Sequence, residues 1–524
     1  MPERLKIQVI KVNQWLESWD KVKFSDTKGK YRSKPQEFFF LFTMNALQLK
    51  KLSDVYIRKR NVANEDETGI QRGHESERSA EIKRFLVNGY PLSESKSKFE
   101  DADGYADLLM PGWLPTAIIA NILPLGARRN GNKLLKTDQI EVIEEEGKQF
   151  LLLPARLDDP AWDPPVYPME IIDGQHRLWA FDDNNPDFSK YEVPVVAFLG
   201  LDLSWQAYLF FTINIKPKKI NRSLAYDLIP MLRVQEWLER SFDKANVYKE
   251  TRAQEIVESL WGIPSSPWHN RINMLGERKN PSNITQAAFI RNLIATFFKS
   301  GTPGKLGGLF GSRLHDTGMP LDWNRIQQIA FIIFLWDKLL ETVLNANEPW
   351  IQSLMESGTD LFADMPATEP AHLKLQKVFF GKYSLISTDQ GVRGILHIFN
   401  DLIFCFATEY NLRNVFHNSK SEPIKEKVDT EEIKELVSIL KRNERLSDFV
   451  SVVCETIVKF DWRTSSFEGL NEIERRNQMI YKGSSGYKEL RIQLLKFGRS
   501  SENFIISRMT KDRKSTRLNS SHRT

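Results

Sequence analysis

The sequence predicts an α/β domain followed by a mainly α-helical domain. In the first half, short apolar runs typical of strands alternate with turns and helical segments, an order that indicates an α/β unit. After about residue 223, apolar residues recur at the 3.6-residue spacing of amphipathic helices. The chain has 524 residues, too many for one ordinary core, and this length also favours more than one domain.

The elements expected in the first domain follow one another along the chain. Residues 35–57 read as a strand and then a helix, and residues 76–89 as a helix with Ser76 as its N-cap and Gly89 near its end. Residues 126–148 are polar and read as an excursion or a hairpin. Pro194 lacks an amide proton, so it places its strand at an edge or marks a strand start. The other expected strands are "AIIANIL", "QFLLLPARL", "VYPMEIID" and "YEVPVVAFLGL", and the other expected helices are "HRLWAFDDN" and "SWQAYLFFTIN".

The second half reads as a series of amphipathic helices separated by loops, without a repeat of fixed period. The expected helices are "SLAYDLIPMLRVQEWLERSF", "TQAAFIRNLIATFF", "WNRIQQIAFIIFLWDKLLETVL", "VRGILHIFNDLIFCFATEY" and "TEEIKELVSILKRN". The Trp and Phe residues in these segments fall at helical spacing, which predicts core packing.

Composition narrows the class of protein. Hydrophobic residues make up 41% and charged residues 27%, as in globular proteins. The charged N-terminus has no apolar segment of a secretory signal, and no run reaches the roughly 18 apolar residues of a membrane helix. We therefore expect a cytoplasmic protein without a membrane partner. Cys405 and Cys454 both lie in apolar runs, which predicts buried thiols in a reducing compartment. No zinc spacing is present, and we expect neither zinc nor haem.

The last residues differ in character from the rest of the chain. Asp512 to His522 can be back-translated codon by codon into a string that resembles a common sequencing-adapter oligonucleotide. We therefore expect residues 512–524 to be a non-native tail and the native C-terminus to be missing. The tail carries a net charge of +3, and the whole chain +5, so the remainder carries only +2. Global charge thus does not argue for nucleic acid.

The stretch "EIIDGQHRLWAF" concentrates polar chemistry at one turn between apolar segments. Where a strand ends in Asp-Gly and a helix follows at once, the free backbone amides of the first helical turn lie close together, which is typical of an anion site. Gly174 permits a positive φ or a close approach. Asp173 can cap the helix or hold a metal or a ribose hydroxyl, and Arg177 can grip a phosphate. His176 can donate to a phosphate or move a proton near neutral pH.

The same residues are also compatible with a merely structural turn. In that interpretation Asp173 is the N-cap of the helix, and Arg177 pairs with Glu170 or Asp182. The motif is too short for its chemistry to decide between the two interpretations.

The pentapeptide "DGQHR" (Asp173 to Arg177) resembles the namesake motif of the DGQHR-domain family, which includes DndB-type and DpdB-type proteins and is similar to the ParB/sulfiredoxin-like fold. Four flanking stretches resemble the family in the same order, over roughly residues 35–230. They are "FFFLFTMNALQLKKLS", "GIQRGHESERSAEIKRFL", "LPTAIIANI" and "VPVVAFLGLDLSWQAYLFFTINIKPKKINRSLAYDL". The helical remainder matches more loosely.

The resemblance implies a pocket built from three boxes, as in ParB-type domains. Gln71, Arg72 and Arg78 fall in the first box. Asp173, Gly174, Gln175, His176 and Arg177 fall in the second, which faces phosphates. Asn214 falls in the third, where a Glu-Asn pair can hold Mg²⁺ in ParB proteins. Here Ile213 replaces the acidic partner, which puts metal-dependent hydrolysis of a nucleoside triphosphate in doubt.

Basic segments are the candidate contacts to a DNA backbone. Lys216, Lys218, Lys219 and Arg222 form a cluster in "KPKKINR". A short basic run is equally typical of a solvated turn, and "RKRN" (58–61) and "GARRNGNK" (126–133) are weaker examples. The string "GTPGKLGG" lacks the Ser or Thr that follows the lysine of a phosphate-binding loop.

Three functions remain open at this point. The first is a DndB-like accessory or regulatory protein of a bacterial DNA-modification or phage-defence system, with DNA and DNA-modification proteins as partners. The second is a nucleotide hydrolase or DNA-modification subunit, with a nucleoside triphosphate and Mg²⁺ as cofactors and Asp173 and His176 as catalytic residues. The third is a non-catalytic scaffold. Homo-oligomerisation is left open.

The expected domain boundaries follow from the same observations. They are an N-terminal extension over 1–34, a ParB-like DGQHR domain over 35–230, a helical domain over 231–511 and the tail over 512–524.

Overall fold

The computed structural model divides into two compact units, Met1–Lys219 and Ile220–Thr524, and each is described by itself. This division falls at residues 219 and 220, whereas the sequence suggested a boundary at residues 230 and 231. The description covers residues 4–24, 33–55, 76–94, 102–214, 222–233, 237–238, 246–274, 284–301, 306–314, 318–357, 370–417, 428–483 and 485–499.

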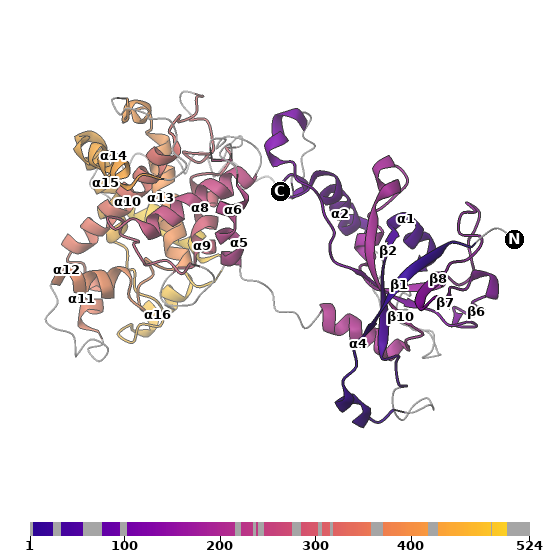
Figure 1. The fold of residues 1–524 in the computed structure, drawn as a ribbon. Coiled ribbons are helices and arrows are strands. Elements are labelled where there is room, and N and C mark those ends of the chain that lie inside the picture. The colour runs from indigo at the N-terminus through magenta and orange to yellow at the C-terminus, as the bar shows by residue number, and fades with distance from the viewer. Residues whose placement is uncertain are drawn as a thin grey trace, which may run out of the picture. The chain divides into compact units, whose positions relative to one another are not determined.

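The first unit combines a sheet with several short helices (Figure 1). Its strands are β1 (Lys6–Asn13), β2 (Phe38–Asn45), β3 (Ser53–Asp54), β4 (Ile118–Ile122), β5 (Arg128–Arg129), β6 (Asn132–Lys133), β7 (Glu141–Glu145), β8 (Lys148–Leu152), β9 (Met169–Asp173) and β10 (Glu192–Leu199). Its α-helices are α1 (Ala46–Leu52), α2 (Ser76–Asn88), α3 (Gln175–Leu178) and α4 (Leu203–Asn214). Its 3₁₀ turns are η1 (Glu17–Lys21), η3 (Leu92–Glu94), η4 (Ala102–Leu108), η5 (Lys136–Asp138) and η6 (Pro186–Lys190).

Eight strands form one mixed sheet in the order β3-β9-β4-β10-β2-β1-β8-β7. The pairs β4/β10 and β3/β9 are parallel, and the other neighbours are antiparallel. Strand β1 lies inside this sheet, so part of the stretch over 1–34 that the sequence set apart as an extension is built into the first unit. The polar stretch after residue 126 forms the hairpin β5–β6 and the strand β7, which pairs with β8.

Pro194 does not mark an edge strand, because β10 lies between β4 and β2 in the middle of the sheet. Pro194 is opposite Thr43 of β2, whereas pairing with β4 starts one residue later, at Val195. The strand therefore has a neighbour on only one side at the proline. This position near the start of β10 tolerates the missing amide proton.

Strand β2 and helix α1 show how the sequence produces the core of the first unit. Phe40, Phe42 and Met44 are buried on one face of β2, and the residues between them are exposed, as the period of two requires. Asn45 then ends the strand and accepts hydrogen bonds from the first amides of α1 through its side chain, at 3.0 and 3.1 Å.

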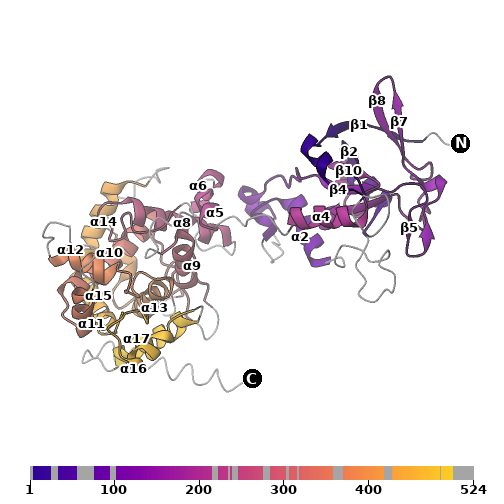
Figure 2. The ribbon, with the colours of Figure 1, turned by 90° about the horizontal axis from the view of Figure 1, so that it is seen from below.

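The second unit contains helices and loops and no strand among its described residues (Figures 1 and 2). Its helices are α5 (Arg222–Asp227), α6 (Ile229–Leu232), α8 (Asn246–Gly262), α9 (Gln286–Thr296), α10 (Arg325–Asn345), α11 (Pro349–Glu356), α12 (Pro370–Lys374), η7 (Leu375–Phe379, a π-helical turn), α13 (Asp389–Cys405), η8 (Leu412–Asn414), α14 (Thr430–Arg442), α15 (Glu444–Val458), α16 (Glu472–Met479) and α17 (Gly486–Arg499). The segment expected as one helix over 223–242 is broken after Asp227, and Pro230 lies in the first turn of α6.

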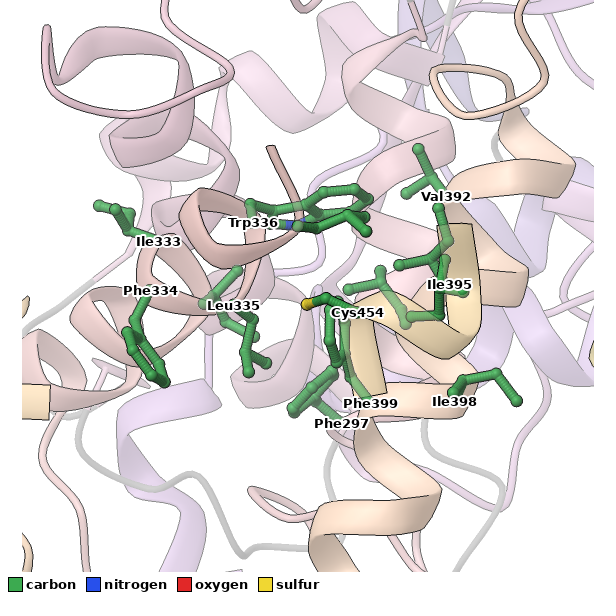
Figure 3. Close-up of a cluster of buried hydrophobic side chains, with 14 of the residues drawn as sticks. Phe297, Ile333, Phe334, Leu335, Trp336, Val392, Ile395, Ile398, Phe399 and Cys454 are labelled. Carbon is green, nitrogen blue, oxygen red and sulfur yellow. The ribbon is translucent and has the colours of Figure 1, made fainter. Parts of the chain in front are cut away.

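The core of the second unit is a single large cluster in which α10 and α13 contribute many of the side chains. Figure 3 shows Trp336 and Leu335 of α10 with Ile395 and Phe399 of α13 around Cys454 of α15. Cys454 is fully buried, and burial raises the pKa of its thiol, so this cysteine behaves as a core residue. Cys405 was also expected to be buried but is exposed at the last position of α13, although the neighbouring Phe404 is buried in the core.

Candidate functional site

The DGQHR turn lies at the junction of strand β9 and helix α3, as the sequence predicted. The first four residues of β9 are buried, and Gly174 follows Asp173 with φ +95°, in the left-handed region that favours glycine. A Cβ at Gly174 would lie 2.6 Å from the Cδ1 of Ile118 and 3.1 Å from the Nη2 of Arg177. The glycine therefore allows the arginine to fold back over the turn.

Asp173 is not the N-cap of α3. Gly174 occupies that position, and it provides no side-chain cap. The Asp173 carboxylate instead accepts a hydrogen bond from Arg177 Nη2 at 2.6 Å. Arg177 also donates through Nη1 to the carbonyl oxygens of Thr116 and Ala117, at 2.7 and 3.2 Å. Arg177 thus pairs with neither Glu170 nor Asp182, and two of its nitrogens bind acceptors of the chain itself.

Helix α4 brings the third box to this turn. Asn214, its last residue, donates through Nδ2 to the other carboxylate oxygen of Asp173 at 3.0 Å. Asp173 and Arg177 are each less than one fifth exposed, at 17% and 18% of their side chains. Asp173 therefore joins two segments that are about 40 residues apart in sequence, and the predicted convergence of Arg177 and Asn214 is observed.

A second polar contact holds α4 against β9 near the start of the strand, at Glu170. Glu170 is buried, and its carboxylate accepts a hydrogen bond from Gln206 Nε2 at 3.1 Å and a bidentate ion pair from Arg129. Gln206 is the only α4 residue that is buried. Both ends of α4 are thus attached to β9 by side-chain hydrogen bonds, which position Asn214 at the turn.

The residues at the turn do not fit the Mg²⁺ ion of the ParB-type third box. Both oxygens of Asp173 accept hydrogen bonds from the chain, and one of these comes from Asn214, the residue expected to hold the ion. Ile213 supplies no ligand atom. Among the described residues, no group of three His, Cys, Asp or Glu side chains is arranged to hold a metal.

Gln175 is the residue of the turn whose hydrogen bonding is incomplete. Its side chain is 5% exposed, and its Nε2 atom has no acceptor within the part of the chain that the structure describes. A buried amide without a partner is costly, so native proteins rarely retain one without a reason. The sequence placed Gln175 in the phosphate-facing box, but it did not show that Gln175 is the side chain of the box with an unsatisfied donor, because that depends on tertiary contacts.

Helix α2, which contains Arg78 of the first box, contacts the DGQHR turn. Ser79 Oγ donates to the backbone oxygen of His176 at 3.2 Å, and the neighbouring Arg78 is exposed in the first turn of α2. Gln71 and Arg72 lie outside the described residues, so their predicted convergence on the pocket stays a prediction.

Only some of the basic segments lie among the described residues. Lys216, Lys218 and Lys219 lie outside the described residues, as do 58–61 and the tail over 512–524. Arg222 starts α5, and its side chain is not described. In "GARRNGNK", Arg129 forms a bidentate ion pair with the buried Glu170. The partner of Arg129 could not be predicted because it lies on a strand 41 residues away.

Comparisons with known proteins agree with the motif. Residues 35–276 match the family model DndB, described as DNA-sulfur modification-associated. The match extends beyond the first unit and includes α5, α6 and α8 of the second. No curated protein and no solved structure matches the chain. None of the described helices has the length and apolar character needed to cross a membrane. The match identifies residues 35–276 as a DndB-family region, and it confirms the resemblance to DndB-type proteins that "DGQHR" and its flanks indicated.

Proposed function

We propose that the protein is a DndB-like accessory protein of a bacterial DNA-modification system, of the phosphorothioation or phage-defence type, and that its DGQHR turn binds a phosphate-bearing ligand. The ligand is either DNA or a nucleotide. The observation that carries the binding site is the buried Nε2 of Gln175, which lacks an acceptor among the described residues. A phosphate oxygen at the turn would supply that acceptor.

In this proposal the other residues of the turn position Gln175. Arg177 is held by Asp173 and by two carbonyl oxygens, so its guanidinium braces the turn and keeps only part of its donor capacity for a ligand. Asn214 holds Asp173 from the side of α4. Because the Asp173 carboxylate is already occupied by two donors, binding is better supported than hydrolysis with Asp173 as a base.

DNA as the ligand is supported by the basic cluster Lys216, Lys218, Lys219 and Arg222. It begins two positions after Asn214 in the sequence. Each cation that neutralises a DNA phosphate adds about 0.9 to the slope of log affinity against log salt concentration. Replacing all four by Gln should therefore lower that slope by up to about three to four units if they contact DNA.

Gln175→Leu in the full chain tests the site. The apolar side chain removes a buried amide that lacks a partner, so the free energy of unfolding should stay within about 1 kcal/mol of the parent. Affinity for a nucleotide or a DNA duplex, measured by calorimetry, should fall roughly tenfold.

Gln206→Leu is the matched control. It removes an equally buried amide whose partners are Glu170 and the backbone oxygen of Leu201, so it should reduce stability and not ligand affinity directly. Unchanged binding in Gln175→Leu would refute the site. Turnover that survives in Gln175→Leu but is lost in His176→Ala, measured by phosphate release, would instead establish the hydrolase.

A further inference from the structure

The sheet of the first unit is apolar on both faces over its central strands. On the face that packs against the core, alternate residues such as Val9, Phe40 and Val195 are buried. The residues between them point to the opposite face, where an antiparallel sheet in contact with solvent normally carries polar side chains. Here seven apolar side chains from four strands lie on that face, which we call the outer face. They are Ile10, Val12, Phe39, Leu41, Ile119, Val196 and Phe198.

A first row of these side chains crosses four neighbouring strands. Ile10 of β1 lies opposite Leu41 of β2, Leu41 opposite Val196 of β10, and Val196 opposite Ile119 of β4. Ile10 is 62% exposed and Leu41 is 36% exposed, and the other two are partly exposed. Since neighbouring strands lie about 4.8 Å apart, this row is about 14 Å wide. It contains no polar side chain.

A second row lies beside the first, two residues away on each strand. Val12 lies opposite Phe39, and the rings of Phe39 and Phe198 are 5.4 Å apart between centroids. Phe198 lies opposite Asn121, and Asn121 opposite Glu170, and these two polar residues are buried. Helix α4 covers that end of the row through its hydrogen bond to Glu170. Over β10, β2 and β1 the row remains partly exposed.

The apolar area on this side of the sheet matches the needs of a stable interface. Helix α4 adds Tyr208 and Phe211, which are 49% and 44% exposed. With the seven side chains of the outer face, they offer on the order of 500 Å² of apolar surface. One partner of a standard interface buries about 800 Å², and about 65% of a homodimer interface is apolar. The two areas are therefore of the same size.

The chemistry of the outer face favours a second copy of this chain over a nucleic acid. Nucleic-acid binding depends on cations that neutralise phosphates, and the two rows contain none. On the β8 side of the rows, Arg4 is paired with Glu141 and Lys6 with Glu145. A flat and uncharged apolar face is complementary to an identical face, because no like charges meet.

We propose that the protein forms a homodimer in which the outer faces of two copies stack on each other. Two sheets that pack face to face lie about 10 Å apart, with their side chains interdigitated, and a two-fold axis makes the contact self-complementary. The proposal concerns a different face of the sheet from the core-facing one, and it does not depend on phosphate binding at the DGQHR turn.

Sedimentation velocity of the full chain without ligand, from low to high micromolar concentrations, tests the proposal. The parent should sediment as a dimer. Leu41→Lys should make the chain monomeric, because each copy would bury a charge without a partner in the apolar contact. Leu41→Thr keeps a residue type that strands favour, and it should raise the Kd of the dimer at least about tenfold.

Val87→Lys is the matched control. Val87 is 51% exposed and belongs to α2, whose Leu86 packs into the core on the opposite face of the sheet. This variant should remain a dimer, and all four proteins should give the same far-ultraviolet circular dichroism. A monomeric parent would overturn the proposal and leave the outer face to a different partner. A dimer that persists in Leu41→Lys, or that is lost equally in Val87→Lys, would overturn it as well.

Discussion

Asp173 and Asp401 are two carboxylates that each join side chains from different segments, but the charges of these partners differ. Asp173 has one cationic partner, Arg177, and one neutral partner, Asn214, and it is 17% exposed. Asp401 has two cationic partners, Lys299 and Arg491, and it is fully buried. Asp173 is thus shared by one cation and one neutral amide, whereas Asp401 is shared by two cations.

This difference shows that a motif with an arginine is not by itself a positively charged site. The arginine of DGQHR pairs with the aspartate of the same motif, so the phosphate binding that we propose for the first unit would depend on other groups, such as Gln175. In the helical unit, one fully buried carboxylate pairs with two cations from other segments. Three substitutions and one change of pH test this difference between the surroundings of Asp173 and Asp401.

Asp401→Ala should produce the largest effect. It leaves Lys299 and Arg491 without their shared carboxylate in a mostly buried position, and such a loss costs about 3–5 kcal/mol of unfolding free energy. Asp173→Ala should cost less, about 1–3 kcal/mol, because its partners reach solvent or backbone acceptors. Hydrogen exchange of peptides from α13 and from β9 measures the two units separately. A larger loss for Asp173→Ala would contradict the comparison.

Gly174→Ala should come next. An alanine at φ +95° is strained by about 1–3 kcal/mol, and its Cβ would also collide with Ile118. Gly131→Ala is the matched control, since Gly131 has φ +81° and nothing within 4 Å of the added carbon. The excess destabilisation of Gly174→Ala over Gly131→Ala, measured by urea unfolding, reports the close approach at the turn. Equal effects would mean that Ile118 and Arg177 move aside without cost.

His397 predicts a dependence of stability on pH. Its pKa is lowered from 6.5 to about 3 in the folded chain. As the pH falls, His397 is therefore protonated at a higher pH in the unfolded chain than in the folded chain. The contribution of His397 to stability is therefore complete above pH 6.5 and is lost as the pH falls from 6.5 towards 3. At pH 5 the loss is about 2 kcal/mol relative to neutral pH. Unfolding measured at pH 7 and pH 5 should show this difference in the parent and not in His397→Gln.

Asn214→Ala should have the smallest effect on stability. It removes one hydrogen bond from Asp173 and leaves Arg177 in place, which costs about 0.5–1.5 kcal/mol. Thermal unfolding measures this change, and Asn214→Asp is the informative companion, because it places a second carboxylate beside Asp173 and should be more destabilising. If the two variants behave alike, Asn214 does not contact Asp173 in solution.

Much of the local structure follows from the sequence, because it depends on neighbours along the chain. The alternation in β2, the side-chain cap at Asn45, the strand–glycine–helix order at the DGQHR turn and the long amphipathic helices α10, α13 and α14 are all visible as spacing and cap residues. The DGQHR pentapeptide with its flanks was also sufficient to indicate the DndB family, which the family match over 35–276 confirms.

Tertiary structure decided the pairings between distant segments. It placed Pro194 in the middle of the sheet, gave Arg129 to Glu170, and set Asp173 between Arg177 and Asn214. It also left Cys405 exposed at a helix end, and it gathered Lys299, Asp401 and Arg491 from three segments of the helical unit. The physical reason is the same in each case. A side chain's partner and its burial depend on which segments pack together, and spacing within one segment carries no information about that.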